Sequence, residues 1–174
     1  MAEFRAGQTG LVVQVPEAEA AVACLREEYD PGARAGVPAH VTLHFPFLDA
    51  AAVDGPVLAA LRALFAGHRA FDVRFAACGR FPGLLYLAPD PDGPLRALMA
   101  ALAARWPEVP PFGGRFTELV PHLTVAHHPD PARLDLIEAA LAPRLPVTTR
   151  ITAAHLLTHD GTRWQRGASF PLHP

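Results

Sequence analysis

Val-Pro-Ala-His-Val-Thr-Leu at residues 37–43 and Leu-Val-Pro-His-Leu-Thr-Val at residues 119–125 are the two stretches that decide the fold. Each is followed by a proline, an amphipathic helical segment and a β-forming run, which begins at Phe71 in the first copy and at Val147 in the second. The same order of elements twice in one chain indicates a duplicated unit. We therefore expect two lobes related by a pseudo-twofold axis, with the two His-x-Thr strands facing each other across a central cleft.

The surrounding segments complete an α+β pattern. Apolar periodicity predicts a helix over residues 55–66 and further helices after Pro16, after Gly93-Pro94 and after Pro131. The runs that favour strands are residues 11–15, 40–45, 71–77, 84–87, 122–125, 147–158 and 164–170. A chain of 174 residues that is 51% hydrophobic is long enough for one well-buried core. We expect residues 1–174 to form a single bilobal domain, with the loop over 107–120 as a functional edge or lid.

Strand alternation places the polar residues of both motifs on one face. The side chains assigned to the cleft face are His40, Thr42 and His44 in the first strand and His122, Thr124, Ala126 and His128 in the second. An imidazole donates or accepts a proton near neutral pH, and a threonine hydroxyl can donate to a phosphoryl oxygen. Two of each in one cleft suit phosphodiester or cyclic-phosphate cleavage, in which one histidine removes a proton and the other supplies one.

His-Val-Thr-Leu at 40–43 and His-Leu-Thr-Val at 122–125 resemble the paired His-x-Thr-x motifs of the 2H phosphoesterase superfamily, specifically its 2′-5′ RNA ligase-like and cyclic phosphodiesterase members. Phe-Pro-Gly-Leu-Leu-Tyr-Leu-Ala at 81–88 and the segment over 164–172 are also similar to that family. The resemblance therefore spans most of the chain.

This resemblance implies a bilobal α+β fold with an antiparallel sheet in each lobe. It also implies metal-independent opening of 2′,3′-cyclic phosphates on RNA ends or small nucleotides, with reversible, ATP-independent 2′-5′ ligation as a related activity. Carried over residue by residue, His40 and His122 are the acid and base pair, and Thr42 and Thr124 hold the phosphate; which histidine plays which role stays open. We expect no cofactor and no metal ion, and a monomer.

Five further residues are weaker candidates for substrate binding. Arg80 and Arg115 are candidate phosphate-neutralising cations, although arginines are usually solvated at the surface. Tyr86 is a candidate for stacking on a base, although an aromatic residue in a strand more often packs. His44 and His128 share the predicted cleft face, although a histidine at a strand end often points into solvent.

Composition excludes several other chemistries. The chain has no Lys, which excludes Schiff-base enzymes, lysyl-nucleotidyl ligases and P-loop nucleotidases. Its only serine, Ser169, lacks the flanking glycines of a nucleophile elbow. The formal net charge of −2 disfavours a protein that wraps long nucleic acid.

Cellular location is predicted from cysteine usage and hydropathy. Cys24 and Cys78 are isolated, so we expect two reduced thiols in a cytoplasmic protein. The first 15 residues lack a signal-peptide pattern, and no stretch approaches the ~18 uncharged apolar residues of a membrane span.

Two rival functions stay open. A metal hydrolase would use a ligand set of His40, His44, His122 and His128, but no Glu follows His40 as in the helical zinc motif, and the surrounding residues favour a strand. A non-catalytic RNA or nucleotide binder of the same fold is the rival from another class. The duplicated imidazole favours catalysis, since proton transfer needs a titratable pair whereas Arg is the better fixed donor.

Overall fold

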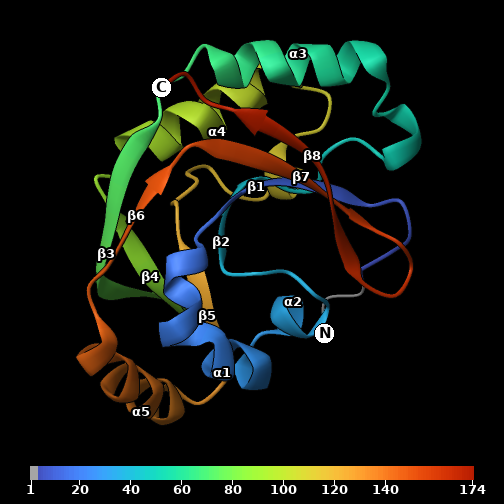
Figure 1. The fold of residues 1–174 in the computed structure, drawn as a ribbon. Helices are drawn as coiled ribbons and strands as arrows, with labels where there is room; N and C mark the ends of the chain where they lie inside the picture. Colours follow the sequence, from blue (N-terminus) through green and yellow to red (C-terminus); the bar gives the residue numbers. More distant parts are fainter. Residues whose placement is uncertain (1–3) are drawn as a thin grey trace.

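The computed structural model describes residues 4–174, which form two four-stranded antiparallel sheets with helices packed around them (Figure 1). The strand order is β2-β1-β7-β8 in the first sheet and β5-β4-β3-β6 in the second. The strands are β1 (Thr9–Gln14), β2 (His40–His44), β3 (Phe71–Phe81), β4 (Leu84–Asp90), β5 (Leu123–His127), β6 (Val147–Ile151), β7 (Ala153–His159) and β8 (Trp164–Pro171). The helices are α1 (Glu19–Tyr29), α2 (Pro31–Arg34), α3 (Gly55–Ala66), α4 (Gly93–Arg105) and α5 (Pro131–Leu141).

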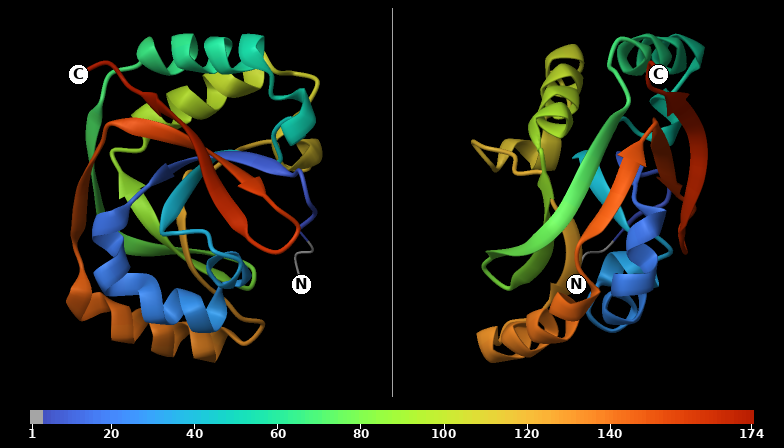
Figure 2. Two further views of the ribbon diagram at one scale, coloured as in Figure 1. Left: turned by 45° about the vertical axis from the view of Figure 1, so that its right-hand side comes forward. Right: turned by 60° about the vertical axis from the view of Figure 1, so that its left-hand side comes forward.

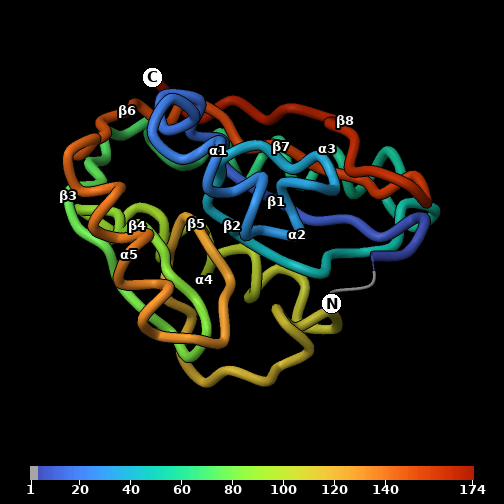
Figure 3. The backbone as a smooth tube through the Cα atoms, turned by 90° about the horizontal axis from the view of Figure 1, so that it is seen from below, coloured from blue at the N-terminus to red at the C-terminus, as the bar shows by residue number. Residues whose placement is uncertain are grey.

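The duplicated unit is confirmed, and it is longer than the sequence indicates. The order β1, α1, β2, α3, β3 is repeated as β4, α4, β5, α5, β6. In each sheet the motif strand lies at the edge and pairs with the first strand of its own unit, β2 with β1 and β5 with β4. The two edge strands β2 and β5 lie side by side in the middle of the molecule (Figure 3).

Two segments link the sheets: β3, which follows β1 and β2 of the first sheet but lies in the second, and the run from β6 to β7, which passes from the second sheet to the first. β3 pairs with β6 over its first half and with β4 over its second. The run expected over residues 147–158 is two strands, because the chain leaves β3 at Ile151 and joins β1 in the other sheet from Ala153 onward. The two lobes are thereby tied together by long strands rather than by a single hinge.

Helices cross between the lobes in the same way. α1 follows β1 but packs on β5 of the second sheet, and α4 follows β4 but packs on β2 of the first. As a result α1 and α5 lie at one end of the molecule, and α3 and α4 lie at the other (Figure 2). Both α3 and α5 begin where sequence reasoning places them, because Asp54 and Asp130 accept hydrogen bonds from backbone N–H groups of the first turn ahead of a proline.

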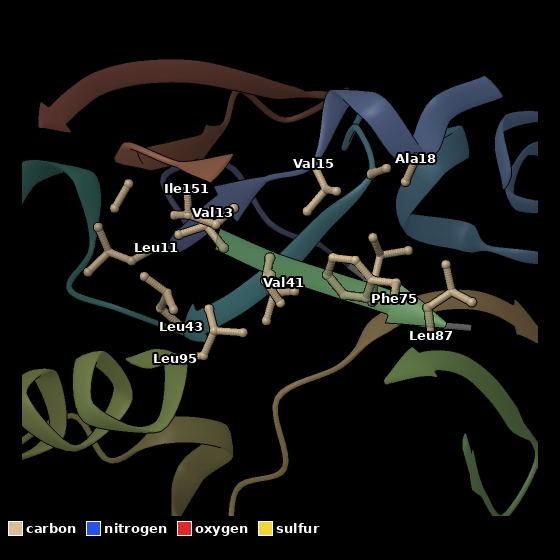
Figure 4. Packing of buried hydrophobic residues seen from close by; sticks show 14 of the residues in the cluster. Leu11, Val13, Val15, Ala18, Val41, Leu43, Phe75, Leu87, Leu95 and Ile151 are labelled. Atoms are coloured by element: carbon tan, nitrogen blue, oxygen red, sulfur yellow. The ribbon is translucent and has the colours of Figure 1, made fainter. Parts of the chain in front are cut away.

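One apolar core runs through both lobes. Leu11 and Val13 of β1, with Leu43 of β2, share it with Phe75 and Leu87 of the second sheet (Figure 4). Each of these side chains is almost fully buried. The continuous core fixes the two motif strands relative to each other. No helix within residues 4–174 is long and apolar enough to cross a membrane.

Candidate active site

A cleft of about 480 Å³ lies between the two lobes. His40, Thr42, His122 and Thr124 all line it, so the two motifs meet in one site as strand alternation predicts. Its other lining residues are Phe4, Gly10, Val12, Asp30, Pro31, Gly32, Val37, Phe45, Leu84, Phe112, His127, Leu157 and Trp164. The cleft is therefore polar where the motifs meet and largely apolar elsewhere.

The two motif histidines are held by matching hydrogen bonds. Nδ1 of His40 lies 2.7 Å from the carbonyl oxygen of Pro38, and Nδ1 of His122 lies 2.7 Å from the carbonyl oxygen of Val120. A carbonyl oxygen can only accept, so Nδ1 must carry the hydrogen in both rings. In the neutral imidazole this leaves Nε2 as the nitrogen with a free lone pair. The carbonyl group two residues before each histidine thus fixes both the orientation and the tautomer of its ring.

Both motif histidines favour the neutral form. Burial lowers the pKa of His40 to about 4, with a further contribution from the positive charge of Arg26. Burial also lowers the pKa of His122, and His127 adds a small effect in the same direction. His40 is consequently neutral at pH 7, with Nε2 able to accept a proton.

Aromatic side chains pack around His122 on its own sheet. The ring centroids of Phe81 and Tyr86 lie 5.3 and 5.4 Å from that of His122. Tyr86 also crosses the backbone of β3 at Gly79, where a Cβ atom would lie 2.4 Å from the Tyr86 ring. Only glycine allows this approach. Tyr86, expected as a stacking platform for a base, instead packs against His122 and does not line the cleft.

A β-bulge follows the threonine of each motif. Val12 pairs with Thr42 but Leu11 pairs with His44, which leaves Leu43 as an extra residue in β2. Tyr86 pairs with Thr124 but Leu85 pairs with Ala126, which leaves Val125 as the extra residue in β5. The bulges stand at equivalent positions in the two units and shift strand alternation by one residue.

The prediction that His44 lies on the cleft face is wrong because of this bulge. His44 is fully buried on the core side, as is Ala126, its equivalent in the second unit. Its Nε2 atom lies 2.7 Å from the carbonyl oxygen of Val109, and its ring packs edge-on against Phe47. His44 therefore anchors the 107–120 loop rather than contacting the cleft.

Beyond the bulges, Phe45 and His127 line the cleft. Simple alternation instead assigns His44, Ala126 and His128 to that face. His127 was missed by sequence reasoning, and a pairing irregularity between two strands leaves no signal in either strand alone. Its Nε2 atom lies 4.0 Å from Oδ1 of Asp30. The prediction for His128 is wrong: its ring packs against Tyr29 outside the cleft, and its Nδ1 accepts a hydrogen bond from the N–H of Asp130.

Asp30 is a buried acid at the edge of the cleft. Its carboxylate accepts hydrogen bonds from the Arg26 guanidinium, with the shorter at 2.9 Å, and from the N–H of Gly32. Arg26 also donates to the carbonyl oxygen of Val37. The ion pair is almost completely buried, so Arg26 is committed to Asp30 and unavailable to a ligand.

Neither predicted arginine lines the cleft. Arg80 sits on the second half of β3 and forms ion pairs with Asp135 and Glu138 of α5. Arg115 is exposed, and its Nε donates to the carbonyl oxygen of Phe112 within the loop. The positive charge expected beside the phosphate is thus not supplied by these two side chains.

The 107–120 loop belongs to the second unit but is fastened to the first. Besides the bond from His44 to Val109, the N–H of Phe112 donates to the carbonyl oxygen of Phe45 at 2.6 Å. Phe112 has a positive φ of 51°, an uncommon conformation for a residue with a side chain. These contacts carry the Phe112 side chain into the cleft, so the loop forms one edge of the site.

The four-histidine ligand set of the metal-hydrolase hypothesis is not assembled. His44 lies in the core and His128 lies against Tyr29, away from the two motif histidines. Across the described residues 4–174, no three His, Cys, Asp or Glu side chains are grouped so as to hold a metal ion.

Two antiparallel sheets in pseudo-symmetric lobes, each bringing a His-x-Thr strand to a shared cleft, define the class of 2H phosphoesterase folds. The family model of the 2′-5′ RNA ligase superfamily matches residues 14–163, and the chain belongs to this superfamily. Sequence comparison with curated proteins gives no match.

Solved structures share the fold at low sequence identity. Escherichia coli LigT complexed with 3′-AMP has a TM-score of 0.64 at 17% identity, over 98% of this chain and 100% of that chain. TT0787 of Thermus thermophilus has a TM-score of 0.57 at 21% identity, over 95% and 97%. Kluyveromyces marxianus Usb1 has a TM-score of 0.50 at 13% identity, over 96% and 99%. The fold therefore extends over essentially the whole described chain.

Proposed function

We propose that this protein hydrolyses 2′,3′-cyclic phosphates, on RNA ends or small nucleotides, by general acid–base catalysis that needs no metal ion. The observation that carries the proposal is the matched pair of Nδ1–carbonyl hydrogen bonds on His40 and His122 in one cleft. Both rings are held in the tautomer that leaves Nε2 free, which is the arrangement that two opposed proton transfers require.

In the proposed reaction, Nε2 of one neutral histidine takes a proton from water as the water oxygen attacks phosphorus. The bond between phosphorus and one ribose oxygen breaks, and the protonated Nε2 of the other histidine gives that oxygen its proton. The product is a 2′- or 3′-phosphomonoester. The hydroxyls of Thr42 and Thr124 donate to the non-bridging oxygens as negative charge builds on them. With an RNA 5′-hydroxyl in place of water, the same steps join two ends through a 2′-5′ bond.

The pKa values favour one assignment of the two roles. His40, with its pKa lowered to about 4, is the better base because it is neutral throughout the neutral range. His122 is then the acid, which must enter the reaction protonated. A negatively charged phosphate between the rings favours the protonated form of His122.

Related structures support a nucleotide as the ligand. Escherichia coli LigT has been solved with 3′-AMP, a nucleoside monophosphate, and also with phosphate. Because these likenesses lie below 25% identity, the chemistry proposed for this chain rests on its own cleft residues.

The experiment that tests the proposal is incubation of the purified protein with nucleoside 2′,3′-cyclic phosphates, with and without a chelator. Turnover that is unchanged by chelation supports the two-histidine mechanism. Turnover lost on chelation and restored by a divalent metal would overturn it in favour of a metal hydrolase. Binding without turnover, measured by calorimetry on the same substrates, would overturn it in favour of a nucleotide-binding protein.

A further inference from the structure

We propose that the cleft selects a single nucleotide carrying the cyclic phosphate over the end of a polynucleotide, with the base held against Phe45 and Phe112. This inference rests on the proposed function and narrows its substrate class. Two independent features of the cleft carry it, which are its charge and the arrangement of its aromatic side chains.

Among the described residues 4–174, those that line the cleft include no arginine, and the whole chain has no lysine. Asp30 is the only carboxylate in this described lining, and it is paired with the buried Arg26. The nitrogen donors of the lining side chains within residues 4–174 are therefore the imidazoles of His40, His122 and His127 and the indole of Trp164. Affinity for a polynucleotide is built from several Lys or Arg contacts to successive phosphates. A site with three imidazoles and two threonine hydroxyls is sufficient for one phosphate and lacks the further cations that a second would need.

Three arginines that could otherwise reach a ligand are held in ion pairs. Arg26 is buried against Asp30, Arg80 is held by α5, and Arg96 bonds to Asp92 and Glu118. Recruiting any of them to an RNA backbone would first break an existing ion pair. The formal net charge of −2 adds no long-range attraction for a polyanion.

An aromatic wall occupies the apolar part of the cleft. Phe45 follows β2, Phe112 comes from the 107–120 loop, and Trp164 begins β8. The ring centroid of Phe45 lies 6.4 Å from that of Phe112 and 5.9 Å from that of Trp164. Bases stack on such side chains with little dependence on sequence.

This wall is fixed by the backbone around it. Gly10 in β1 lets Phe45 lie close against the strand, since a Cβ atom there would be 3.0 Å from Cδ2 of Phe45. The backbone N–H of Phe112 donates to the carbonyl oxygen of Phe45. This hydrogen bond holds the backbones that carry the two rings next to each other. Phe45 and Thr42 line the same cleft, so the proposal places the base on this wall and the phosphate of the same nucleotide at Thr42.

Cleft size agrees with a ligand of this kind. A volume of about 480 Å³ falls in the lower part of the ~300–1,000 Å³ range of small-molecule sites. It suits one nucleotide inside the cleft.

The experiment compares three substrates of the wild-type protein. These are adenosine 2′,3′-cyclic phosphate, a five-nucleotide RNA ending in the same adenosine 2′,3′-cyclic phosphate, and methyl riboside 2′,3′-cyclic phosphate, which has no base. The expected kcat/KM for the mononucleotide exceeds that for each of the others by about tenfold or more, and it changes little between low and high salt. A stacked base is commonly worth between about 5-fold and 150-fold in binding.

Two substitutions in the 107–120 loop test whether the base of the nucleotide binds against Phe112. Phe112→Ala is expected to raise KM for the mononucleotide about tenfold and to leave the base-free substrate unchanged. Phe116→Ala is the matched control, because Phe116 packs on Phe112 but is 60% exposed and does not line the cleft. Circular dichroism and thermal melting confirm that both variants are folded.

Failure of the proposed selectivity and failure of cyclic-phosphate hydrolysis give different results. Equal or faster turnover of the RNA would overturn the inference while leaving cyclic-phosphate hydrolysis intact. Equal turnover of the base-free substrate, or no effect of Phe112→Ala, would overturn the base site. Failure to cleave all three substrates would overturn the proposed function itself.

Discussion

His127 occupies in the second unit the position that Phe45 occupies in the first, three residues beyond the motif threonine and just past a β-bulge. The equivalence makes a pseudo-symmetric site chemically asymmetric. On one side the bulge delivers a phenyl ring, and on the other it delivers an imidazole 4.0 Å from the buried carboxylate of Asp30. The two motifs are symmetric, but the residues beside them offer an apolar ring on one side and a polar ring on the other, which suits a substrate whose two ends differ in polarity.

His127→Ala is expected to raise KM for a nucleoside 2′,3′-cyclic phosphate about tenfold while kcat changes little. The reason is that, within residues 4–174, His127 is the one cleft imidazole outside the two motifs, in a lining without arginine. Steady-state kinetics provide the measurement, and Arg80→Ala is the control because Arg80 is held by α5. A larger effect of Arg80→Ala than of His127→Ala would contradict this account of the phosphate site.

Tyr86→Ala is expected to lower kcat about tenfold with little change in KM, because Tyr86 packs against the His122 ring and sets its position. Tyr86→Phe keeps the ring and should retain most of the activity. Steady-state kinetics with the nucleotide and the base-free substrate check both variants. If Tyr86→Ala instead raised KM for the nucleotide alone, Tyr86 would be a base-stacking residue.

His44→Leu is expected to destabilise the protein by about 1–3 kcal/mol, since it leaves the Val109 carbonyl without its buried donor. Urea unfolding measures this loss. His44→Gln, which can keep a donor, should lose less. An unchanged stability together with a raised KM would contradict the burial of His44 and return it to the cleft.

The free energy of unfolding is expected to fall as pH is lowered from about 6.5 towards 4. Burial lowers the pKa of His40, His44, His122 and His155, so the unfolded chain takes up protons in this range before the folded protein does. Each unit of pKa difference is worth about 1.4 kcal/mol. Urea titrations across the range test this, and His40→Gln, which cannot titrate, should flatten the slope. A stability that rose on acidification would contradict it.

Much of the fold follows from local patterns in the sequence. Helical periodicity places α3 and α5, and the repeated motif predicts the pseudo-twofold arrangement. Alternation along each strand correctly brings His40, Thr42, His122 and Thr124 to one cleft. The patterns succeed here because each of these features depends on residues within a few positions of one another.

Features that depend on distant partners could not be predicted. The bulges arise from the pairing of β2 with β1 and of β5 with β4, so they are invisible in either motif alone, and they move His44 out of the cleft and His127 into it. Arg80 meets Glu138, which lies 58 residues later, through the packing of α5. Sequence patterns give residue types and faces, but tertiary pairing decides which side chains reach the site.

The most direct test of the central claim is the pH dependence of kcat/KM on a nucleoside 2′,3′-cyclic phosphate for the wild type, His40→Ala, His122→Ala and the double variant. The wild type should give a bell-shaped profile, rising near pH 4 as His40 loses its proton and falling at higher pH as His122, whose pKa burial also lowers, loses its own. Each single variant should lose about 10²- to 10⁴-fold and one limb of the profile, and the double variant should lose little more. Wild-type activity in either single variant would contradict paired-histidine catalysis.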